Sequence, residues 1–167
     1  METKKLIKIL GFEPKENTAD VYIKKYSSVN NYALEIDFDS KTINFGNKIK
    51  GESKTTQNFS QAENWVVLEC VDRLLTKGYK PEDITLEKVF PSGHGHSGRL
   101  DVFIQKNGKA FLMIECKTFR KEYEKELKNI YKNGGQLFTY FQNDTNTQYL
   151  MLYTSHLNGN RIDANWD

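Results

Sequence analysis

Residues 99–118, which decide the fold, read RLDVFIQKNGKAFLMIECKT. Asn107-Gly108 is a strong turn signal between two apolar runs, so we expect a hairpin of strands over residues 99–105 and 109–118. Both runs are apolar at successive positions, which is typical of central strands covered on both faces. Asp101, Glu115 and Lys117 are the polar exceptions, and charged groups in such strands indicate a purpose beyond packing.

Whether these three charged residues lie together depends on the turn. Glu115 and Lys117 are two residues apart and therefore point to the same face of their strand. A two-residue turn at Asn107-Gly108 would place Asp101 opposite Ile114, on the other face. A three-residue turn with its glycine in a left-handed conformation and a G1 bulge, or a bulge elsewhere, would bring Asp101 and Glu115 to one face. We predict such an arrangement.

Two carboxylates beside a lysine suit one kind of chemistry. Carboxylate oxygens are hard ligands for Mg²⁺, which keeps several of its waters when it binds a protein. The metal lowers the pKa of a bound water and stabilises negative charge on a phosphate, while the lysine can orient that water. The alternative is a buried salt bridge between Lys117 and one of the acids, which the loose D…E-x-K spacing leaves open.

The rest of the chain alternates helices and strands, and the clearest helix covers residues 63–75. Apolar side chains recur there at helical spacing from Val66 to Leu75, and Gly78 follows as a C-terminal cap. Ser60-Gln61-Ala62-Glu63 fits a capping box at its start. We further expect helices over residues 4–11, 121–132 and 136–142, strands over residues 21–23, 32–38, 42–45, 84–90 and 149–154, and loops over residues 46–58 and 91–98.

Composition narrows the classes of function. The 167 residues match one domain, and 38% apolar residues with 2 Trp, 9 Tyr and 10 Phe argue against a disordered chain. A net charge of +2 does not by itself mark a nucleic-acid binder. No run approaches the roughly 18 apolar residues of a membrane span, so we expect no membrane partner. Cys70 and Cys116 lie in apolar runs, which predicts reduced thiols and a cytoplasmic protein.

Three segments together resemble one nuclease family. Asp101 followed by IECKT (residues 114–118) resembles the PD-(D/E)XK nuclease motif, although Leu100 stands where the motif has proline. GGQLFTYF (residues 134–141) resembles the Q-x-x-x-Y motif of the branch found in type I restriction enzymes. ENWVVLECVDRLLTKGY (residues 63–79) resembles the helix before the nuclease strands in that branch. The chain, over roughly Phe59 to Ser155, thus resembles the N-terminal nuclease domain of type I restriction motor (R) subunits and of related restriction-methylation enzymes.

The resemblance implies a metal site. Asp101 and Glu115 would be metal ligands, with the carbonyl oxygen of Cys116 as a third, and Lys117 would position the attacking water. Glu63 matches the helix carboxylate that can complete the metal shell. The implied cofactor is Mg²⁺, and Mn²⁺ is expected to substitute for it.

Other residues are expected to support the site or to contact DNA. The resemblance implies this for Gln136 and Tyr140, which lie four apart on one helical face. Arg99, two residues before the proposed ligand Asp101, would meet either a phosphate or a core acid. Lys121 begins a stripe that is either a solvated helix face or a surface for backbone phosphates. The stripe consists of Lys121, Lys125, Lys128 and Lys132.

Several residues have purely structural interpretations. Glu63 would occupy the N3 position of the capping box that begins at Ser60, rather than act as a ligand. Glu69 is expected to be solvated on the other face of the same helix. His94 and His96 lack further zinc ligands at a suitable spacing, so a flexible loop that contacts DNA is preferred over a zinc site.

We therefore expect one α/β domain with a mixed central β-sheet flanked by helices, similar to restriction endonucleases. Residues 1–58 would contain an accessory β-hairpin and residues 59–167 the nuclease core, as a fragment of a larger enzyme. The expected function is Mg²⁺-dependent hydrolysis of double-stranded DNA in a restriction-modification enzyme. Other domains or subunits would supply sequence specificity and a helicase motor or a methyltransferase. The alternatives are a catalytically silent module that binds DNA or a partner protein, and a scaffolding domain with a buried ion network.

Overall fold

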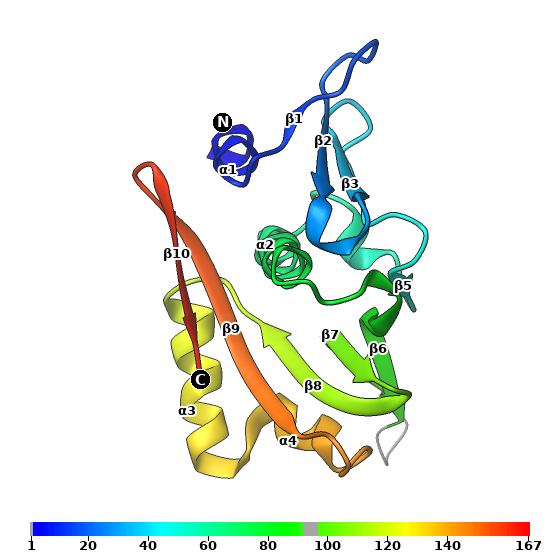
Figure 1. Ribbon diagram of the computed structural model, residues 1–167. Coiled ribbons are helices and arrows are strands. Elements are labelled where there is room, and N and C mark those ends of the chain that lie inside the picture. Colours follow the sequence, from blue (N-terminus) through cyan, green and yellow to red (C-terminus); the bar gives the residue numbers. More distant parts are fainter. Residues whose placement is uncertain (1, 92–96) are drawn as a thin grey trace.

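The computed structural model describes residues 2–91 and 97–167, which form an α/β structure with two β-sheets and, in these ranges, four α-helices (Figure 1). The larger sheet contains β5 (Lys50–Gly51), β6 (Ile84–Pro91), β7 (Ser97–Lys106), β8 (Lys109–Cys116), β9 (Tyr149–Asn158) and β10 (Arg161–Trp166). Their spatial order is β10-β9-β8-β7-β6-β5. The pairs β5–β6 and β8–β9 are parallel and the others antiparallel. The predicted α/β class is therefore confirmed.

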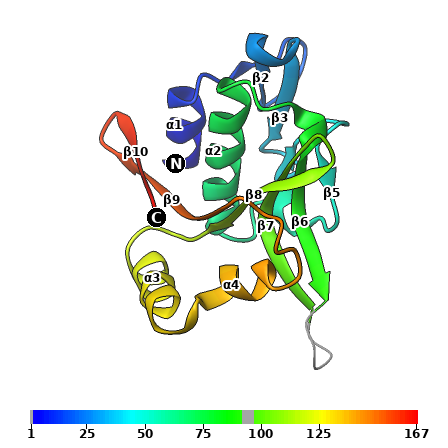
Figure 2. The same cartoon turned by 60° about the horizontal axis from the view of Figure 1, so that its bottom comes forward.

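Helices cover both faces of this sheet (Figure 2). The helix α2 (Glu63–Thr76) packs on one face through side chains such as Val67 and Val71, which meet Val102 and Ile114 in what we call the α2-side core. The helices α3 (Lys121–Asn133) and α4 (Gly135–Phe141) pack on the other face. Their Tyr123, Leu137 and Tyr140 join Leu100, Phe103 and Met113 in the α3–α4-side core. Burial of each large aliphatic side chain contributes about 1.5–3 kcal/mol, so the two cores hold the sheet between the helices.

The N-terminal residues form a second, smaller sheet. After α1 (Glu2–Ile9) come β1 (Glu13–Pro14), β2 (Val21–Tyr26), β3 (Tyr32–Asp37) and β4 (Thr42–Asn44), antiparallel in that order. The predicted hairpin is present as β3 and β4, and two further strands extend it. Its Leu34 and Ile36 belong to the α2-side core. The Lys24 ammonium and the Tyr26 hydroxyl both donate to Asp72 Oδ1 on α2, at 2.5 and 2.7 Å, and so attach the smaller sheet to the helix.

Two local predictions are wrong. Residues 46–58 are not entirely a loop, because Lys50–Gly51 pairs with β6 as an edge strand and Thr55–Gln57 forms a 3₁₀ turn. Two residues of backbone pairing need no apolar pattern, so the sequence carries no signal for them. The capping box is also absent: α2 begins at Glu63 after Ala62, and no side chain caps it. Instead, the Asn64 amide donates to the carbonyls of Thr55 and Asn58 and fixes the entry to the helix.

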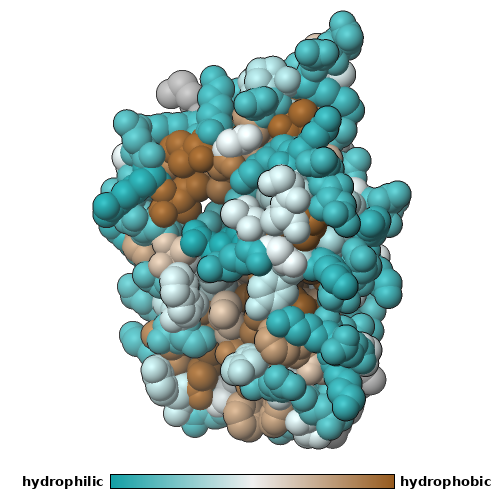
Figure 3. Space-filling model, viewed as in Figure 1, coloured by the Kyte–Doolittle hydropathy of each residue, from teal (hydrophilic) through white to brown (hydrophobic). Residues whose placement is uncertain are grey.

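The surface carries hydrophobic side chains in separate patches among hydrophilic ones on the face that Figure 3 presents. No helix within the described ranges is long and apolar enough to cross a membrane.

The predicted loop 91–98 begins as the end of β6 and ends as the start of β7. Residues 92–96, with His94 and His96, lie outside the described part of the chain.

Candidate active site

A bulge in β8, not the length of the turn, aligns the two acids of the central hairpin. Lys106 pairs with Lys109, and Asn107 (φ 52°) and Gly108 (φ 73°) form a two-residue turn with two left-handed residues, as Asn-Gly favours. The predicted three-residue turn is therefore wrong. The pairing shifts between Gln105 and Ile104, which leaves Phe111 as an extra residue. The alternative of a bulge elsewhere is confirmed.

Beyond the bulge, the register brings the acids together. Val102 pairs with Ile114, and continuing this register by one residue puts Asp101 opposite Glu115. Asp101 Oδ2 accepts a hydrogen bond from the backbone N–H of Cys116 at 2.7 Å. The carboxylates of β7 and β8 therefore lie at one place on the sheet, as predicted.

A lysine and a third acid complete this cluster. Lys117 Nζ donates to Glu115 Oε1 at 2.6 Å and lies 3.6 Å from Glu63 Oε2, at the first residue of α2. The Glu115 side chain is 2% exposed, Lys117 14% and Glu63 27%, so the cluster opens toward solvent on the Glu63 side. The capping interpretation of Glu63 is wrong, and its contact with Lys117 places it beside the two hairpin acids.

One oxygen of Glu115 has no partner. Oε2 is buried and accepts no hydrogen bond from any described residue. An unsatisfied buried charged oxygen costs at least about 1–3 kcal/mol, which a cation or a proton would relieve. No three His, Cys, Asp or Glu side chains within the described ranges are arranged to hold a metal. The two carboxylates of Asp101 and Glu115 are the kind of donor that a hydrated Mg²⁺ uses, because this ion typically binds one or two carboxylates and keeps several of its waters.

Burial and mutual repulsion shift the pKa values of the acids. Burial raises the pKa of Glu115 to about 7, although the Lys117 charge opposes the shift. Burial and the Glu115 charge raise the pKa of Asp101 well above its usual range. Burial raises the pKa of Glu63 as well, although the positive charge of Lys117 opposes this shift. Burial alone would lower the pKa of Lys117, but the charges of Glu115 and Asp101 raise it overall, so this lysine stays protonated.

Tyr140 supports the strand that carries Asp101. Its hydroxyl donates to the carbonyl oxygen of Arg99 at 2.8 Å, two residues before Asp101. A Cβ on Gly98 would lie 2.5 Å from Cε1 of Tyr140, so only glycine allows the ring to lie this close to β7. Burial, followed by the Glu115 and Asp101 charges, raises the pKa of Tyr140. Its motif partner Gln136 is exposed and is held through its backbone N–H.

The acceptor for that N–H is Glu126, which sequence analysis missed. Glu126 is 6% exposed, and its Oε1 accepts from Gln136 N at 2.8 Å while Oε2 accepts from Asn129 at 3.1 Å. It thereby fixes the start of α4, which carries Tyr140. Three acids alternate with lysines in the sequence of α3, so nothing there distinguishes the buried acid from its exposed neighbours.

Three further predictions have mixed outcomes. Arg99 meets a core acid, because its NH1 lies 3.4 Å from Oε2 of the buried Glu87. Lys121 and the rest of its stripe are exposed. The prediction that Glu69 is solvated is wrong: it is 2% exposed, accepts from Arg73 at 2.5 Å, and also accepts from the Tyr153 hydroxyl. The reason is that β9 covers this face of α2, which the helix pattern alone does not show.

The two cysteines are free and buried, as expected for packed thiols. Burial raises the pKa of the Cys116 thiol well above its usual range, followed by the effect of its neighbour Cys70. The Cys116 sulfur is therefore protonated, and this residue can serve the cluster only through its backbone.

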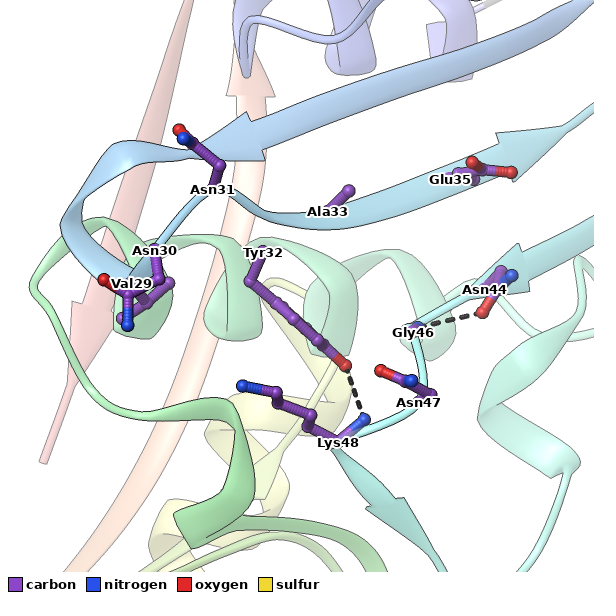
Figure 4. A pocket seen from close by; sticks show the side chains of 10 residues that line it. All are labelled: Val29, Asn30, Asn31, Tyr32, Ala33, Glu35, Asn44, Gly46, Asn47 and Lys48. Atoms are coloured by element: carbon purple, nitrogen blue, oxygen red, sulfur yellow. Dashed lines mark hydrogen bonds between the residues drawn. The ribbon is translucent and has the colours of Figure 1, made fainter.

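A separate pocket of about 560 Å³ lies on the smaller sheet (Figure 4). The Tyr32 hydroxyl accepts from the backbone N–H groups of Lys48 and Ile49 and donates to the carbonyl of Phe45. Tyr32 thus ties β3 to the following segment. None of the residues that line the pocket belongs to the Asp101–Glu115–Lys117 cluster.

Comparison with known proteins identifies no family for this chain, so any function must be argued from the geometry of the site. No protein-family profile matches the chain, and no curated protein matches its sequence.

Proposed function

We propose that the chain is a Mg²⁺-dependent DNA endonuclease module whose site is the cluster of Asp101, Glu115, Lys117 and Glu63. One observation carries the proposal: Glu115 is buried, gives one oxygen to Lys117, and leaves the other oxygen without a partner. An oxygen left free next to a second carboxylate suits a divalent cation.

In this proposal each residue has one task. Asp101 and Glu115 hold the metal with the Cys116 carbonyl, and a bound Mg²⁺ supplies a Lewis acid for the phosphate and lowers the pKa of water. Lys117, fixed between Glu115 and Glu63, orients the attacking water and offsets charge developing on the phosphate. Tyr140 is a positioning residue, because it holds β7 next to Asp101.

The proposal further places this nuclease module in a restriction enzyme. The support for this step is the resemblance of four parts of the sequence to the nuclease domain of type I restriction enzymes, namely residues 63–79, 101, 114–118 and 134–141. In that context double-stranded DNA is the substrate. A specificity component and a motor or methyltransferase belong to other domains or subunits, and the protein acts in the cytoplasm.

The test is cleavage of supercoiled plasmid with Mg²⁺ by the wild type, Lys117→Ala and Lys8→Ala. Lys8 is an exposed lysine on α1, so its substitution is the matched control. We expect the wild type and Lys8→Ala to cleave equally and Lys117→Ala to lose at least about 100-fold in rate, as removal of a positioned proton-transfer or charge-stabilising group does. Equal cleavage by Lys117→Ala would contradict the mechanism. Binding without cleavage by the wild type would favour the catalytically silent module.

A further inference from the structure

An unusual backbone conformation lies directly beside Asp101. Glu87, in the middle of β6, has φ of +54°, a left-handed value that is rare for residues other than glycine. Pairing between β6 and β7 continues on both sides of it, with Leu86 opposite Val102 and Lys88 opposite Leu100. In that register Glu87 stands opposite Asp101.

The faces of the sheet reverse where this left-handed residue lies. Leu100 and Val102 are two residues apart, so in a regular strand both would face one core. Val102 and its partner Leu86 instead belong to the α2-side core, whereas Leu100 belongs to the α3–α4-side core. The reversal therefore falls at Glu87 and Asp101. Strained backbone next to a functional group suggests that the residue is retained for a task.

The task visible in the structure is to hold Arg99. Glu87 is 7% exposed, and its Oε2 accepts from the Thr55 hydroxyl and lies 3.4 Å from Arg99 NH1. The same NH1 lies 3.2 Å from Ser53 Oγ and 3.3 Å from Thr55 Oγ1. All of these contacts use one nitrogen of a side chain that is half exposed. No described residue accepts a hydrogen bond from Nε or NH2.

A guanidinium held in this way presents a free edge. The Nε–H and NH2 donors form a planar fork that matches two oxygens of one phosphate. Glu87, which holds Arg99, stands opposite Asp101 in the β6–β7 register, so this edge lies at the border of the cluster that is proposed to cut the phosphodiester bond. A buried acid behind the guanidinium limits its rotamers, which lowers the entropy lost when it binds.

We propose that Glu87 is a positioning residue that holds Arg99 as a clamp for a backbone phosphate of the DNA next to the scissile bond. The inference rests on the proposed function, because it takes DNA as the ligand. The alternative to a phosphate clamp is a purely structural role, in which Glu87 and Arg99 only attach the segment Ser53–Gln57 to the sheet. That alternative predicts a change in stability but none in DNA binding.

The experiment measures the affinity for a fluorescent DNA duplex against salt concentration, in EDTA so that no cleavage occurs. The variants are Arg99→Ala, Glu87→Gly and Arg99→Lys, with Lys8→Ala as control. Glycine adopts a positive φ without strain, so Glu87→Gly keeps the backbone while it removes the carboxylate. Thermal unfolding of each variant is measured in parallel.

We expect Arg99→Ala to weaken binding and to lower the slope of log affinity against log salt by about 1, the effect of one lost phosphate contact. Glu87→Gly should unfold at or above the wild-type temperature and still bind DNA more weakly. Arg99→Lys should keep the slope and lose part of the affinity. Wild-type slope and affinity in Arg99→Ala, or wild-type affinity in Glu87→Gly, would overturn the clamp while leaving the nuclease proposal intact. A wild type that binds no DNA would overturn both.

Discussion

The carboxylate of Asp101 is hydrogen-bonded to the backbone N–H of Cys116 at 2.7 Å, so the acid of β7 is attached to the residue between Glu115 and Lys117 on β8. This bond sets the spacing of the two carboxylates through the backbone of the sheet rather than through flexible side chains. It also brings two acids into one partly buried place, where each makes ionisation of the other less favourable. The site is therefore expected to reduce the stability of the metal-free protein.

Asp101→Asn should stabilise the metal-free protein. The pKa of Asp101 is raised in the folded state, so the folded protein keeps a proton that the unfolded chain has lost. Stability contributed by this group is present below the ordinary pKa near 4 and is lost as pH rises through the raised value. We expect Asp101→Asn to be more stable than the wild type by about 1–2 kcal/mol at pH 8, as is common when a functional acid is removed.

Chemical unfolding at several pH values checks this, and the difference between the two proteins should shrink toward pH 4. Asp39→Asn, which changes an exposed acid in the same way, is the control for the substitution itself. A wild type more stable than Asp101→Asn at pH 8 would contradict the prediction.

Gly98→Ala should destabilise the protein through Tyr140. The added Cβ would lie 2.5 Å from the Tyr140 ring. Overpacking of this kind typically lowers the free energy of unfolding by about 1–3 kcal/mol, because side chains and backbone must shift to make room. The cost should be smaller when Tyr140 is already alanine, because the obstructing ring is gone. A double-mutant cycle measured by urea unfolding gives the coupling between the two positions. Additive effects would show that Gly98 is needed for another reason.

Glu126 should affect activity through α4. Glu126→Ala leaves the Gln136 N–H without its acceptor, whereas Glu126→Gln retains an acceptor oxygen. We expect Glu126→Ala to lose about 1–3 kcal/mol of stability and to cleave plasmid more slowly, since α4 carries Tyr140. Glu126→Gln should remain close to the wild type in both measurements. Equal losses in the two variants would instead point to a role for the Glu126 charge.

The sequence was sufficient to predict the strands around Asn107-Gly108 and the helix over residues 63–75, because their patterns are local. The shared face of Asp101 and Glu115 was also predictable, but only from the chemistry of two acids and a lysine. A bulge was one of the two arrangements predicted to produce this shared face, but its position at Phe111 was not predictable, since that depends on how neighbouring strands pack. Asn107-Gly108 forms the two-residue turn that this dipeptide favours locally. The bulge at Phe111 then shifts the pairing of β7 with β8 by one residue.

The other contacts that the sequence did not predict involve polar residues whose partners are distant in sequence. Glu126 bonds to a residue in the next helix, Glu69 to a tyrosine 84 residues away, and Glu87 to Thr55, 32 residues away. Each looks like a solvated acid in its own segment. Helix and strand periodicity report which face is apolar, not which acid is covered by another element, so these contacts appear only in the folded chain.

Binding of Mn²⁺ measured by isothermal titration calorimetry tests the central claim most directly, because it asks whether Asp101 and Glu115 hold a divalent cation independently of any cleavage. The proteins are the wild type, Asp101→Asn, Glu115→Gln and, as control, Glu124→Gln, which changes an exposed acid on α3. We predict equal affinity for the wild type and Glu124→Gln, and a loss of at least about tenfold in each of the other two. Wild-type affinity in Asp101→Asn and Glu115→Gln would contradict the account.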